Sequence, residues 1–74
     1  MVKKQVMLTF SQEQVREPII YNLSNQFQIV TNIHRADIAD ERGWAIVELE
    51  GDAEKIEQGI VWMTARGVRV DPAP

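Results

Sequence analysis

Apolar and polar residues alternate along residues 27–38, and the alternation changes phase once. Ile29 and Ile33 fall on one face at a period of two, as expected for a strand, and this face is predicted to pack in the core. After Ile33 the apolar phase moves by one residue, because Ala36 and Ile38 continue the same face. A slip of this kind predicts a β-bulge, and bulges often re-aim a side chain at a functional site. The opposite face of this strand carries Val30, Asn32 and His34.

Apolar spacing and end signals predict the other elements in the same way. Pro18 suits the first turn of a helix, Asp52 is a good N-cap, and Gly67 is typical of a helix C-terminus. The run from Asp40 to Gly43 predicts a turn, in which Gly43 supplies a positive φ angle. Strands are predicted over residues 3–10, 27–38, 44–50 and 68–70, and helices over about 17–25 and from Asp52 to Arg66.

This order of elements predicts an α+β protein with the ferredoxin-like βαββαβ fold. Right-handed crossovers put the first and third strands at the centre of a four-stranded antiparallel sheet, with two helices on one face. The predicted spatial order is fourth, first, third, second, so the 27–38 strand lies at an edge. We expect a single domain over residues 1–74, with a core from about 3 to 71 and a short tail over 72–74.

Helices on one side of the sheet leave the other side open. The open face is predicted to carry Met7, Thr9, Val30, Asn32, His34, Trp44 and Ile46. Such an apolar set forms a patch that a soluble monomer rarely exposes. We therefore expect a homodimer, formed through this face with Trp44, Ile46 and Val30 at the interface, or by pairing of the 27–38 edge strand.

Composition and charge exclude several classes of function. The 74 residues include no cysteine, which excludes disulfides, CxxC redox chemistry and thiolate metal sites. A net charge of −3 argues against nucleic acid, whose phosphates need a basic surface. No stretch is long and apolar enough to insert in a membrane, and no signal peptide precedes the first strand. We expect a cytoplasmic protein.

Candidate catalytic groups are sparse. His34 is the single histidine, so a multi-histidine metal site is excluded. The sequence has no Ser/His/Asp triad in a credible order and no glycine-rich phosphate loop. We expect no enzyme activity, no metal and no cofactor. The remaining acidic residues fall around a turn or on outward strand positions and are predicted to be a solvated charged surface: Asp37, Asp40, Glu41, Glu48 and Glu50.

Several short motifs occur in an order that is typical of one known family. They are Pro18 before an apolar helix, the run Asn32-Ile33-His34, Gly51-Asp52 before the second helix, and the closing run from Gly67 to Val70. From Val6 to about Val70 the chain resembles the NIL domain, the C-terminal regulatory domain of bacterial methionine-importer ATPases. This domain also occurs beside ferredoxin-type iron–sulfur modules and as a free-standing protein. Its name comes from an Asn-Ile-Leu run, so His34 stands where the family has leucine.

The resemblance implies a function as well as a fold. NIL domains are similar to the ACT family of amino-acid-sensing domains. In the transporter branch they pair, and methionine binds near the interface of the pair to inhibit import. By this resemblance Asn32 would contact the ligand, and His34 beside it would alter the preference for methionine. The regulated ATPase would have to be a partner protein.

Two functional hypotheses remain open. The first is a regulatory module that binds a small amino acid such as methionine between two copies. In this case Met7, Val30 and Ile46 would line an apolar slot for a thioether, with Asn32 and His34 as its polar neighbours. The second is a structural module for dimerisation or protein interaction, whose open face holds a transporter component or an iron–sulfur protein.

Overall fold

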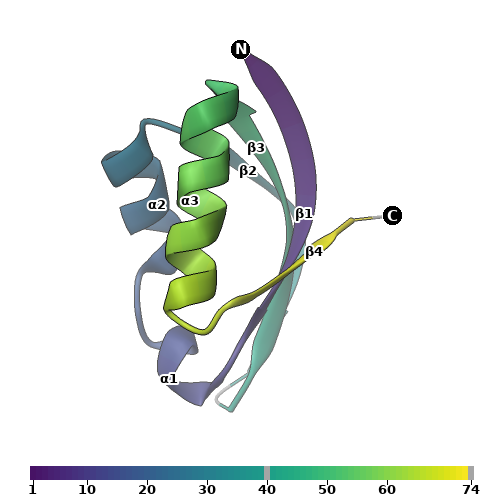
Figure 1. Cartoon of the computed structure of the whole chain (residues 1–74). Helices are drawn as coiled ribbons and strands as arrows, with labels where there is room; N and C mark the ends of the chain where they lie inside the picture. Colours follow the sequence, from purple (N-terminus) through teal and green to yellow (C-terminus); the bar gives the residue numbers. More distant parts are fainter. Residues whose placement is uncertain (40, 74) are drawn as a thin grey trace.

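The computed structural model describes residues 1–39 and 41–73. Within these residues the elements are β1 (Val2–Phe10), α1 (Gln12–Val15), α2 (Ile19–Phe27), β2 (Val30–Ile38), β3 (Gly43–Gly51), α3 (Ala53–Ala65) and β4 (Arg69–Pro72). The four strands form one antiparallel sheet in the order β2-β3-β1-β4. Helices α2 and α3 lie side by side against one face of this sheet (Figure 1). The predicted α+β ferredoxin-like fold, and its strand order, are confirmed.

The core lies between the central strands and the two long helices. Strands β1 and β3 pair over their whole length, with Val6 opposite Val47 and Leu8 opposite Ala45. The alternate residues of both strands that face the helices are buried. Burial of these apolar side chains is the main driving force for folding. The buried core consists of Val6, Leu8, Phe10, Ile19, Leu23, Ile29, Ala45, Val47, Leu49, Ile56, Met63 and Val68.

The bulge predicted from the change of phase is present in β2. Ile33 lies opposite Val47 and Arg35 lies opposite Ile46, so His34 is the extra residue. The helix-side face of β2 is nevertheless less buried than its apolar pattern predicts. Ile33 is on that side but is 57% exposed, because an edge strand has a neighbour along one side only. The expectation that Ile33 packs in the core is therefore wrong.

The end of α3 is held by a motif that the sequence indicates in part. Gly67 has a φ angle of 89°, and its N–H donates to the carbonyl of Thr64 while the N–H of Val68 donates to that of Met63. These two bonds form a Schellman motif. The side chain of Gln14, in the unpredicted helix α1, adds a bond by donating its Nε2 to the carbonyl oxygen of Arg66 at 2.7 Å.

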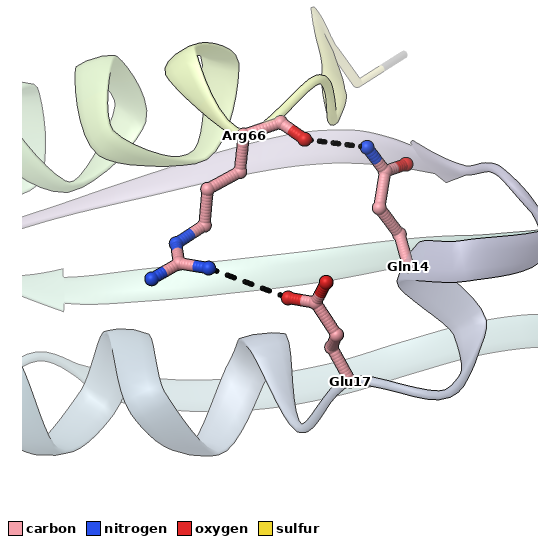
Figure 2. A network of polar contacts seen from close by, with 3 residues as sticks. All are labelled: Gln14, Glu17 and Arg66. Carbon is pink, nitrogen blue, oxygen red and sulfur yellow. Dashed lines mark hydrogen bonds and ion pairs between the residues drawn. The ribbon is translucent and has the colours of Figure 1, made fainter.

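Gln14 and its neighbours connect α1 to α3. The Oε1 of Gln14 accepts from the N–H of Ser11 at 2.8 Å, so both ends of this buried amide are used. Figure 2 shows that the Arg66 side chain turns the other way, with Nη1 3.4 Å from Glu17 Oε2. Figure 1 shows α1 at the end of the sheet where β4 begins, close to the end of α3. The network therefore fixes the helix layer at that end.

Three details at the turn and the C-terminal end differ from the predictions or extend them. Gly43 does not belong to the positive-φ positions of the described residues, so its predicted role is wrong. It is needed for close approach instead, since a Cβ there would lie 3.0 Å from Cγ1 of Ile38. Strand β4 continues to Pro72, two residues beyond the predicted Val70, and the N–H of Ala73 donates to the Gln5 carbonyl. Asp40 of the predicted turn and residue 74 of the predicted tail lie outside the described residues.

Candidate functional site

The face of the sheet away from the helices carries two neighbouring rows of side chains. In one row Ile46 of β3 lies between Met7 of β1 and Arg35 of β2. In the next row Trp44 lies between Thr9 and Asp37. Met7, Thr9, Trp44 and Ile46 are all half-buried. The centre of this open face is thus apolar, and its edge along β2 is charged.

A groove of about 500 Å³ lies over these two rows at the end of the β2–β3 hairpin. Its floor comes from strands β1 and β3, and its rim comes from the hairpin. We call it the open-face groove, and it is lined by Met7, Thr9, Asp37, Ala39, Arg42, Gly43, Trp44 and Ile46. The lining combines an apolar floor with one acidic and one basic side chain. This is the composition expected of a site for a small ligand with polar ends.

A polar cluster lies further along the same face. Asn32 is opposite Glu48, and Nε2 of His34 is 3.4 Å from Oε2 of Glu48. Glu48 follows Ile46 by two residues, which is roughly 7 Å along a strand. Beyond this cluster Val30 lies opposite Glu50 and is 53% exposed. The polar cluster therefore borders the open-face groove but does not line it.

The five candidate ligand-binding residues accordingly divide into two groups. Met7 and Ile46 are directly opposite each other and line the groove. Asn32 and His34 are together on the same face, with Val30 further away. Of the three candidate interface residues, Trp44 and Ile46 are in the groove and Val30 is at the far end of the strand. All of them lie on the open face.

The charged rim of the groove was not predicted from the sequence. Asp37 was expected to be part of a solvated charged surface, and Arg42 was assigned only to a turn. The predicted bulge could have indicated this rim. A slip at His34 puts Arg35 and Asp37 on the same side of the sheet as Ile46 and Trp44. The sequence contains no sign of the hollow itself, because the hollow is lined by residues of three strands and of the hairpin, which only the folded sheet brings together.

Other groups of the described residues do not form a chemical site. Within residues 1–39 and 41–73, no group of three or more His, Asp or Glu side chains could hold a metal ion. Trp62 on α3 packs edge-on against Phe27 at 5.9 Å, and the guanidinium of Arg66 lies 4.5 Å from its ring centre. These contacts join α2 to α3 on the side away from the groove. No helix in the described part of the chain is both long and apolar enough to cross a bilayer.

Comparison with known proteins identifies the family. The model of the NIL domain matches residues 4–72. The chain belongs to the NIL domain family. This match covers both long helices, the last three strands and most of β1, so the resemblance seen in the short motifs is confirmed over nearly the whole chain.

Two relatives of this NIL domain have informative names. The Methionine import ATP-binding protein MetN 1 of Enterococcus faecalis (strain ATCC 700802 / V583) is 32% identical over 75 residues. The aligned region covers 93% of this chain and 21% of that protein, so the chain spans about a fifth of its relative's length. A solved structure, the C-terminal domain of an ABC transporter / ATP-binding protein from Enterococcus faecalis, superposes with a TM-score of 0.83. Its sequence identity is 25%, covering 93% of this chain and 81% of that one.

Proposed function

We propose that this NIL domain binds a small amino acid of the methionine class on its open face and acts through a partner protein. The observation that carries the proposal is the open-face groove, about 500 Å³ with an apolar floor and charged rim. A relative of this domain is named as a methionine import protein, which supports methionine as the first ligand to test. The regulated partner would be a methionine importer or an iron–sulfur protein. The domain would act by binding and not by turnover.

A second copy of the chain would complete the site. Small-molecule sites usually bury most of the ligand surface, and an open groove on a sheet face cannot do so alone. Trp44 and Ile46 present half-buried apolar surface in the groove, and Val30 adds an exposed apolar side chain further along the face. Pairing of two such faces would remove this surface from water and enclose the ligand. The proposed active form is therefore a homodimer.

The polar cluster would contribute to recognition from the other side of Ile46. Asn32 offers both a donor and an acceptor, so its amide can bind either polar group of an amino acid. Its side chain is exposed, which leaves it accessible to a ligand. His34 already has Glu48 as a partner at 3.4 Å and would orient that carboxylate. Met7 and Ile46 would contact the thioether side chain.

Isothermal calorimetry with methionine tests the ligand, and Asn32→Ala tests the polar cluster. The substitution is expected to weaken binding by about 1–3 kcal/mol, because a charged group of the ligand loses a hydrogen bond. Asn25→Ala, which removes an exposed amide from α2 on the other side of the sheet, is the matched control and should bind like the unchanged chain. Equal affinity of Asn32→Ala and the unchanged chain would remove Asn32 from the site.

The second candidate function is a structural pairing module without a small ligand. It is favoured by the same apolar residues, Met7, Trp44 and Ile46, which a partner could cover directly. Thermal unfolding separates the two functions. A ligand raises the melting temperature progressively, roughly with the logarithm of its concentration above the dissociation constant, whereas a pairing module responds only to protein concentration. A melting temperature that no amino acid changes would favour the pairing module.

A further inference from the structure

We infer that two copies of the chain pack open face to open face with their strands antiparallel, around a two-fold axis that crosses the strands between the rows of Trp44 and Ile46. This inference rests on the homodimer of the proposed function and specifies its geometry. Each copy would then supply charged side chains to the rim of the other copy's open-face groove. The evidence is the distribution of charge around the two apolar rows.

Each of the two rows ends in one acidic and one basic residue. The row of Ile46 runs from Asp71 on β4 to Arg35 on β2. In the row of Trp44 the signs are reversed, because that row runs from Arg69 on β4 to Asp37 on β2. The charge at each edge of the open face therefore changes sign from one row to the next.

The bulge creates this pattern on β2. Because His34 is the extra residue, Arg35 and Asp37 lie on the open face of the sheet. Without the extra residue, both would be on the helix side. The edge of the apolar rows along β2 thus carries a basic and an acidic residue, two positions apart.

A two-fold axis across the strands places each row of one copy on the other row of the second copy. Ile46 then packs on Trp44 of the second copy, and Arg35 faces Asp37 of the second copy. The acidic and basic residues at the β4 edge face each other in the same way. The apolar rows cover each other, and every charge at their ends meets a charge of opposite sign. Face-packed sheets are roughly 10 Å apart, a gap that an arginine and an aspartate can bridge from opposite sides.

The same axis also pairs the residues just outside the two rows. Glu48 lies two residues beyond one row and Arg42 two residues before the other, so Glu48 of each copy faces Arg42 of the other. Arg42 and Asp37 are the charged residues that line the open-face groove. No ion pair formed among residues 1–39 and 41–73 includes either of them. The second copy would neutralise both, with its Glu48 and its Arg35.

Two other ways of pairing fit the surface less well. An axis parallel to the strands, between β1 and β3, would lay the polar half of each face on the same half of the second copy. Glu48 and Glu50 of both copies would then be buried near the axis, which costs desolvation and like-charge repulsion. Pairing through the β2 edge would leave the rows of Trp44 and Ile46 in water. The axis across the strands covers the apolar rows and leaves the polar half of each face hydrated.

Sedimentation of mixtures of charge-reversed chains, with one chain fluorescently labelled, tests this arrangement. Asp37→Arg and Arg35→Asp each put two pairs of like charges into the homodimer, so each is expected to raise the dissociation constant about tenfold. Their equimolar mixture forms a heterodimer in which every pair again has opposite signs, and its dissociation constant should return to about that of the unchanged chain. A second mixture, of Glu48→Lys with Arg42→Glu, should be weakened and restored in the same way.

Matched variants and alternative mixtures decide the outcome. Arg16→Asp and Glu54→Arg change the net charge by the same amounts at exposed residues of the helix layer, and both should associate like the unchanged chain. Effects confined to the first mixture would indicate pairing through the β2 edge. Restoration in a mixture of Asp37→Arg with Arg69→Asp would indicate an axis parallel to the strands.

Either of these results, or a failure of both mixtures to restore association, would overturn the inference while leaving the proposed homodimer intact. An unchanged chain that stays monomeric at high micromolar concentration, with and without methionine, would overturn both. Circular dichroism of each variant confirms that it is folded.

Discussion

The two faces of the sheet are built by the same strands but have different surroundings. On β3 the residues Ala45, Val47 and Leu49 point to the helices and are 0% exposed. Their neighbours Trp44 and Ile46 point the other way and remain half-buried. Both sets are apolar, so apolar character alone does not decide whether a residue of β3 is buried. The period of two decides only which face of the sheet each residue is on. The cover of a face comes from elsewhere in the fold, and on the open face the described chain supplies none.

The largest loss of stability is expected from a substitution on the face of the sheet that the helices cover. Leu49→Ala removes a fully buried side chain, and the loss of contacts together with the cavity is expected to destabilise the fold by about 3–4 kcal/mol. Ile46→Ala removes a similar side chain from the open face and should cost less than about 1.5 kcal/mol in dilute solution, where it is only partly buried. Urea unfolding followed by circular dichroism measures both. Equal losses would show that the open face is covered even at low concentration.

The second largest effect is expected on self-association, from a substitution on the open face of the sheet. Trp44→Ala is expected to weaken self-association by about 2 kcal/mol, roughly a thirtyfold rise in dissociation constant, because large aromatic side chains anchor interfaces. Val61→Ala removes an exposed apolar side chain from α3 and should leave association unchanged. Sedimentation over a range of concentrations measures both. An unchanged chain that is monomeric at high micromolar concentration would contradict the proposed dimer.

The smallest effect is expected where α3 ends, because a substitution there should weaken the packing of the helix layer at one end of the sheet. Gly67→Ala puts a Cβ 2.7 Å from Nε2 of Gln14, at a φ angle that favours glycine, and is expected to cost about 1–2 kcal/mol of unfolding free energy. Gly51→Ala is the matched control, since its Cβ would find no atom closer than 3.6 Å. Denaturant unfolding gives both values. A loss in Gly51→Ala as large as in Gly67→Ala would show that the Schellman motif has no special role.

Much of the fold could be predicted because its pattern is local. The phase slip after Ile33 gave the bulge at His34, and the order of elements gave the sheet topology. The short helix α1 was missed because its residues are mostly polar. Ser11 and Gln14 have the spacing of a capping box, which is the pattern that would have revealed it. The true role of Gly43 depends on contact with Ile38 across the hairpin, which no local pattern contains.

The sequence predicted which face of the sheet carries the candidate site, but not the groove within that face. Period-two spacing correctly placed Met7, Asn32 and Ile46 on one side of the sheet. It could not show that Asp37 and Arg42 border the same hollow, since that depends on how the hairpin and the central strands lie in the folded sheet. Nor could it show that His34 lies near Glu48, because the bulge changes the register of the pair. Distances between strands are a property of the packed sheet.

The bulge at His34 also has a consequence for how β2 can pair with strands of other chains. β2 is an edge strand with exposed Val30, Ile33 and Ile38, the kind of segment onto which other chains add strands and form fibrils. A regular strand nine residues long would offer an uninterrupted row of backbone donors and acceptors. The extra residue interrupts that row in the middle, so an incoming strand can match either half in register but not both. A β-bulge is one of the devices by which edge strands avoid pairing with other chains, and here it interrupts a strand whose Val30, Ile33 and Ile38 are exposed.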